Sequence, residues 1–102
     1  MKSRRSKACD ISMKVKEKVF ARDGGRCVIC GNAYNVMPNA HYISRAKGGL
    51  GIEQNIFTAC TNLTNLKCHS RFDDYGIGKE KVIANFKKHY ENWNEEDLYY
   101  KK

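Results

Sequence analysis

The chain has 102 residues, 41% of them hydrophobic, with a mean hydropathy of −0.69, which suits one small domain with a limited core. No apolar run approaches the length of about 20 residues that a membrane-spanning helix needs, so we expect no membrane-embedded segment. Domains of this size usually depend on a metal ion or on disulfides, which makes the five cysteines informative.

The net charge of +8 comes from the first half of the chain. Residues 1–50 carry eleven Lys and Arg against three Asp and Glu, whereas residues 51–102 carry eight of each. A basic half indicates a polyanionic partner, most often nucleic acid. The alternative is that surface lysines only keep a small protein soluble. The asymmetry favours nucleic acid.

In chain order, residues 1–10 are expected to form a basic, loosely ordered arm, and residues 11–102 a single domain. Ser12 is expected to cap a helix to about Arg22, where apolar residues recur at i, i+4 spacing. The later expected elements are a strand turning through a knuckle (26–31), a loop (32–39), short strands (40–44 and 56–59), a helix from about 67, a break (75–78) and a last helix (about 79–93).

The last expected helix places four large side chains on one face, which is more typical of core packing than of a ligand site. They are Ile83, Phe86, Tyr90 and Trp93. A short sheet combined with several helices predicts an α+β fold.

The cysteines are expected to be metal ligands. The segment Met1–Lys7 is charged but has no apolar run behind it, so it does not read as a secretory signal. We therefore expect a cytoplasmic protein, in which paired cysteines serve as ligands more often than as disulfides. The odd number of cysteines agrees, because one must be left over.

Four of the five cysteines form a candidate zinc site. Cys27 and Cys30, with Gly31 following, have the spacing of a zinc knuckle, and Cys60 and Cys68 would complete a tetrahedral set. Four protein ligands leave no open position, so this zinc would be structural. The alternative is four ordinary buried cysteines. Cys9 falls outside the pattern.

The chain from about residue 20 to 75 resembles the HNH endonuclease family, also called ββα-metal nucleases, and in particular small phage or prophage HNH proteins. The segments that carry the resemblance are Cys27–Cys30, Ala40–Gly49, Asn55–Cys60 and Cys68–Asp73. The family order is a knuckle, a His-containing strand, a basic Gly-Gly loop, an Asn, and a Cys-His pair on a helix. The resemblance implies a zinc-bound treble clef with flanking helices.

The resemblance also implies a metal-dependent endonuclease that hydrolyses DNA phosphodiester bonds with low sequence specificity. His41 would be the general base, and Asn55 would hold the backbone of the His41 loop or polarise the ring. His69 would bind a catalytic Mg²⁺ or similar divalent ion, with Asp73 four residues later as a second ligand. The residues placed to contact the DNA backbone are Arg45, Lys47 and Arg71.

Two departures from the family pattern bear on this hypothesis. Ala40 stands where many members have a metal-binding Asp or His, so water or Asn39 would have to fill that position. Cys60 and Cys68 are five residues further apart than usual, which predicts an extra loop over the zinc site. Ala40 favours an alternative, a catalytically impaired, zinc-stabilised nucleic-acid-binding module.

The sequence is also compatible with partners other than DNA. A homodimer would supply the two active sites that a double-strand break needs, and phage packaging proteins are compatible with the resemblance. A protein-interaction adaptor that uses the Tyr- and Trp-rich C-terminus is a third hypothesis, against which the charge asymmetry argues.

Overall fold

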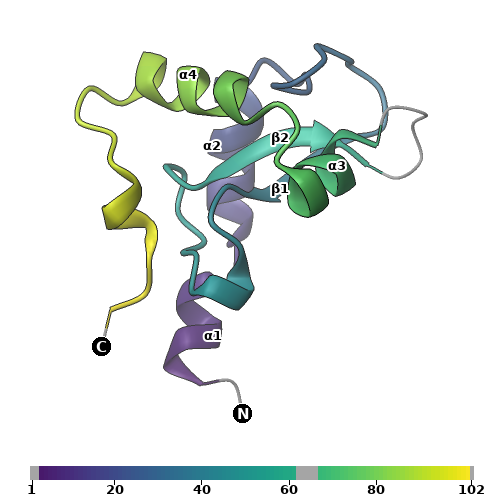
Figure 1. Cartoon of the computed structure of the whole chain (residues 1–102). Coiled ribbons are helices and arrows are strands. Elements are labelled where there is room, and N and C mark those ends of the chain that lie inside the picture. The colour runs from purple at the N-terminus through teal and green to yellow at the C-terminus, as the bar shows by residue number, and fades with distance from the viewer. Residues whose placement is uncertain (1–2, 62–66, 102) are drawn as a thin grey trace.

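The computed structural model describes residues 3–61 and 67–101 as an α+β arrangement of a two-stranded sheet and surrounding helices (Figure 1). The elements are α1 (Arg4–Cys9), α2 (Met13–Arg22), β1 (Val36–His41), a 3-10 helix η1 (Arg45–Lys47), β2 (Ile56–Cys60), α3 (Cys68–Tyr75), α4 (Lys79–His89) and a 3-10 helix η2 (Glu95–Leu98). No helix in these two stretches is long and apolar enough to cross a membrane.

The sheet is an antiparallel pair, β1 and β2, with the first residue of β1 opposite the last of β2. Its register shifts between Met37 and Ala40. Pro38 lies at this shift, where the regular hydrogen bonding between the strands is already interrupted and the missing N–H of proline costs little. The predicted strand at 56–59 is confirmed. The prediction of a loop at 32–39 and a strand at 40–44 is wrong, because β1 begins earlier and ends at His41.

The predicted helix that begins after Ser12 is confirmed as α2, and the Ser12 hydroxyl accepts a hydrogen bond from the Val15 backbone N–H. The prediction of a loosely ordered arm over residues 1–10 is wrong for its described part. Residues 4–9 form α1, which Ser3 caps through a hydrogen bond from the Ser6 N–H. Tertiary contacts hold this short helix, because its Cys9 is only 2% exposed.

Aromatic side chains dominate the core between the sheet, α3 and α4. Phe57 of β2 packs edge-on against Phe72 of α3 at 4.9 Å between ring centroids. Phe86 of α4 stacks on Trp93 at 5.3 Å. The predicted apolar face is therefore used for packing, but α4 ends at His89, so Trp93 reaches the core from the turn that follows and not from the helix.

A buried ion pair joins α2 to the rest of the fold. Arg22 and Asp23 contact each other at 2.8 Å, and their side chains are 8% and 0% exposed. Arg22 also donates to the backbone carbonyl of Ile56, while Asp23 accepts from the backbone N–H of Thr58 and the side-chain amide of Asn85. These contacts fasten α2 and α4 to β2.

Two further expectations concern the chain around the cysteines. Residues 26–31 form turns and not the expected strand. The extra loop that the Cys60–Cys68 spacing predicts falls mainly on residues 62–66, which lie outside the described residues. The helix expected from about residue 67 is confirmed as α3.

Candidate metal centre and catalytic pocket

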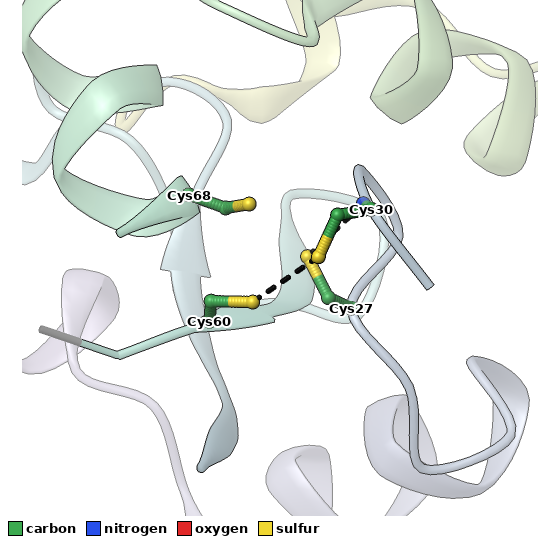
Figure 2. A group of neighbouring side chains, drawn as sticks. All are labelled: Cys27, Cys30, Cys60 and Cys68. Atoms are coloured by element: carbon green, nitrogen blue, oxygen red, sulfur yellow. Dashed lines mark hydrogen bonds between the residues drawn. The ribbon is translucent and has the colours of Figure 1, made fainter. Parts of the chain in front are cut away.

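Four cysteine side chains from three parts of the fold come together (Figure 2). Cys27 and Cys30 lie in the turn after α2, Cys60 ends β2, and Cys68 begins α3. Their four sulfur atoms lie within 4.8 Å of one another. Sulfurs at the corners of a zinc tetrahedron lie about 3.8 Å apart when each Zn–S bond is about 2.3 Å, so this donor set fits zinc.

The four sulfurs are free of disulfides, and two of them accept hydrogen bonds. The Cys30 backbone N–H points at the Cys27 Sγ at 3.5 Å, and the Asn32 amide donates to the Cys60 Sγ at 3.8 Å. Burial raises the pKa of the Cys68 thiol. Because ligating thiols must lose their protons, metal binding here is coupled to proton release.

On the other side of α3, the side chains of His41, His69 and Asp73 line one cavity of about 600 Å³. His41 ends β1, while His69 and Asp73 lie one turn apart on α3. The Nε2 atom of His69 and the Oδ2 atom of Asp73 are 3.2 Å apart. The structure therefore brings together the imidazole from the hairpin and the imidazole and carboxylate from the helix.

A backbone carbonyl orients the His41 ring. The Nε2 atom lies 2.9 Å from the carbonyl oxygen of Cys9 in α1. A carbonyl oxygen can only accept, so Nε2 carries the hydrogen and Nδ1 has the free lone pair of the neutral ring. Burial lowers the pKa of His41 below its ordinary value, and the nearby charge of Arg45 lowers it further. The hydrogen bond to the Cys9 carbonyl and the charge of Asp73 raise it, but by less than burial lowers it. The neutral ring is therefore favoured near pH 7.

Asn55 is fully buried and supports the loop that follows His41. Its Oδ1 accepts from the Ile43 N–H at 2.8 Å, and its Nδ2 donates to the carbonyls of Ile43 and Leu50 at 3.1 and 2.8 Å. Of the two predicted roles, this geometry corresponds to holding the backbone. The His41 Nε2 instead bonds to the Cys9 carbonyl.

Two of the three predicted DNA-contacting residues, Arg45 and Lys47, lie together in η1, and Arg71 lies apart from them. Arg45 lines the cavity and also forms an ion pair with Asp10 at 2.8 Å. Lys47, exposed in η1, lines an adjoining hollow that His41 and Asp73 share. Arg71 is exposed on α3 but lines neither hollow, because two helical residues of rotation from His69 turn it away.

Several contributors to this site were not predicted from the sequence. Lys16 of α2 lines the cavity, and α1 reaches it through the Cys9 carbonyl and through Arg5, which donates to the Ala46 carbonyl at 2.7 Å. A backbone carbonyl leaves no signal in a sequence. The one available hint was the basic charge of the N-terminal arm, which is compatible with a position beside a polyanion site.

Comparison with protein-family models, with curated proteins and with solved structures found no match.

Proposed function

We propose that this protein is a metal-dependent endonuclease of the HNH type that hydrolyses DNA phosphodiester bonds. The observation that carries the proposal is the meeting of His41 from the hairpin with His69 and Asp73 from α3 around one cavity. The order β1–β2–α3 and the four-cysteine cluster beside it agree with a zinc-bound treble clef that carries a ββα-metal site.

His41 fits the role of general base. Its ring is neutral near pH 7, and the Cys9 carbonyl fixes the hydrogen on Nε2, which leaves Nδ1 to accept a proton from water. The resulting hydroxide would attack the phosphorus atom, and the bond from phosphorus to the 3′ oxygen would break. Asn55 would keep the His41 loop in place for this step.

His69 and Asp73 fit the role of ligands for a divalent cation such as Mg²⁺. Their donor atoms are already neighbours, at 3.2 Å. When bound, such an ion stabilises the negative charge that develops on the phosphate and the leaving oxygen. Asp73 is 48% exposed, so a phosphate group can approach this side of the pair.

The charge around the cavity favours DNA as the substrate. Lys16 and Arg45 line the cavity and Lys47 the adjoining hollow, and the first half of the chain carries the whole net charge. These cations can contact phosphates, which position a duplex without reading its sequence. Low sequence specificity is therefore part of the proposal.

The test is a nicking assay on supercoiled plasmid with and without Mg²⁺ or Mn²⁺. We expect wild type to nick only with the metal, and His41→Ala to be slower by about 10²–10⁴-fold, the usual contribution of a general base. The matched control is His89→Ala. His89 is exposed on α4, and its hydrogen bond within the described residues is local, to the Asn85 carbonyl, so its removal should leave the rate unchanged.

Two results would contradict the enzyme proposal: no metal-dependent nicking by zinc-loaded wild type, or equal nicking by wild type and His41→Ala. A shift of DNA in a gel without cleavage would instead support the alternative of a nucleic-acid-binding module. Elemental analysis of the same samples should find about one zinc per chain.

A further inference from the structure

A residue that lines the candidate catalytic cavity has a buried side-chain oxygen without a partner. Asn39 of β1 lines the cavity together with His41, His69 and Asp73. Its side-chain Oδ1 is buried and has no hydrogen-bond partner within residues 3–61 and 67–101. A buried carbonyl oxygen is normally satisfied, so an unpartnered one on a residue that lines a cavity is available to accept a ligand. The other unpartnered buried oxygen of the described residues, Thr58 Oγ1, does not belong to a residue of this cavity.

The neighbouring donors are too few to hold a cation well. Within the described residues, the four-cysteine group is the only cluster of three or more His, Cys, Asp or Glu close enough to bind a metal. His69 and Asp73 therefore form a pair that lacks a third donor of these types. An amide oxygen is a hard donor of the kind that Mg²⁺ and Mn²⁺ accept, so an Asn side chain can supply the donor that the pair lacks.

The hairpin explains why the third donor does not come from position 40. Ala40 lies opposite Phe57 and belongs, fully buried, to the core cluster. A carboxylate there would be placed in an apolar environment, away from the cavity. Asn39 precedes Ala40 and lies within the register shift of β1. Both Asn39 and His41 line the cavity, whereas Ala40 between them does not.

We propose that Asn39 is a third protein ligand of the divalent cation at His69 and Asp73, and that it binds through Oδ1. The inference rests on the proposed function of this pocket. Because Asn39 is neutral, Asp73 is the one anionic ligand, so a bound divalent ion keeps a net positive charge. This charge favours a phosphate as the next ligand, and it makes the cation site itself weak.

The test measures Mn²⁺ binding to the zinc-loaded protein without DNA, from the electron paramagnetic resonance signal of free Mn²⁺. Asn39→Ala should weaken binding by about tenfold or more, since even outer-shell changes cost about 10–100-fold. Asn39→Asp should tighten it by about tenfold, because it adds the missing carboxylate. The control is Asn92→Asp, which adds the same charge at an exposed position in the turn after α4.

The outcomes separate this inference from the function it rests on. If His69→Ala abolishes Mn²⁺ binding while both Asn39 variants bind as wild type does, the role of Asn39 is overturned and the metal pocket stands. If wild type shows no His69-dependent binding, both fail. Zinc content and thermal melting identify any variant that has not folded. If Asn39→Ala does not fold, Asn39→Asp still decides the test, because the Asp side chain has nearly the same shape as that of Asn.

Discussion

The four-cysteine cluster and the candidate catalytic pocket are built from the same β1–β2–α3 unit but differ in their donors. Cys68 and His69 are consecutive residues of α3, and the rotation of about 100° per helical residue sends them to different sites. Cys68 is buried among the other thiols, whereas His69 is 27% exposed and lines the cavity. The first two residues of α3 therefore belong to different sites, Cys68 to the cysteine cluster and His69 to the pocket.

The difference in donors separates the candidate structural site from the pocket of the proposed reaction. Four thiols complete a tetrahedron and leave no position for water or substrate, which suits a structural ion. The pocket offers an imidazole, a carboxylate and an amide oxygen beside an open cavity, which leaves positions for water and phosphate. A change in the cluster should therefore affect the fold, and a change in the pocket should affect the reaction.

The largest expected effect comes from Cys60→Ser. A serine oxygen replaces a thiolate poorly as a zinc ligand, and structural zinc sites contribute about 10 kcal/mol or more of binding energy that is coupled to folding. We expect loss of zinc and of cooperative thermal unfolding, measured by elemental analysis and circular dichroism.

The matched control is Cys9→Ser. Cys9 is 2% exposed but lies outside the cluster, so this variant should keep its zinc. A Cys60→Ser protein with full zinc content and an unchanged melting curve would show that the cluster is not a metal site.

A smaller effect, on both fold and pocket, is expected from Asn55→Ala. The change leaves the Ile43 N–H and two buried carbonyls without partners, which should cost about 2–4 kcal/mol in the free energy of unfolding. Zinc content should stay at wild-type level, because Asn55 contacts none of the cysteines in these hydrogen bonds. Urea unfolding gives the free energy, and Asn92→Ala, at an exposed position, should show almost no change.

A smaller change in stability than that of Asn55→Ala is expected from Gly51→Ala, which acts on the pocket through α1. A Cβ at Gly51 would overlap the Asp10 carbonyl oxygen, so the end of α1 must move away. We expect a cost of about 1–3 kcal/mol. We also expect slower plasmid nicking with unchanged zinc, because the Cys9 carbonyl would lose its place at His41.

The control for this prediction is Gly24→Ala. A Cβ at Gly24 meets nothing within 4 Å, but the backbone has φ of +67°, so the variant should lose about 1 kcal/mol of stability through strain alone. If Gly51→Ala and Gly24→Ala reduce nicking equally, α1 has no specific role in the pocket.

Local signals in the sequence were sufficient for several elements. The Ser12 cap and the apolar spacing after it predicted α2, and the apolar run at 56–59 predicted β2. The Cys27–Cys30 spacing predicted half of a four-ligand cluster, because one short turn places both residues. These features depend on neighbours in the chain, so they were within reach of the sequence.

Features that depend on distant contacts were missed. The arm was expected to be loose because a helix of six residues is not stable alone, yet Arg5 and the Cys9 carbonyl fasten it to the loop after β1. The sequence predicts a strand over residues 40–44, later than β1 begins, because Pro38 is typical of a loop. Only the register shift accommodates Pro38 within the strand.

The sequence by itself therefore determined the α+β class, the identity of the four thiols and the candidate residues of the pocket. Only the tertiary structure decided which atoms face one another there: the Cys9 carbonyl that fixes the His41 tautomer, the Asn55 amide that holds the loop, and the unpartnered Asn39 oxygen. The physical reason is that residue type and spacing specify chemistry and local conformation, whereas hydrogen-bond partners distant in the chain are chosen when the whole fold packs.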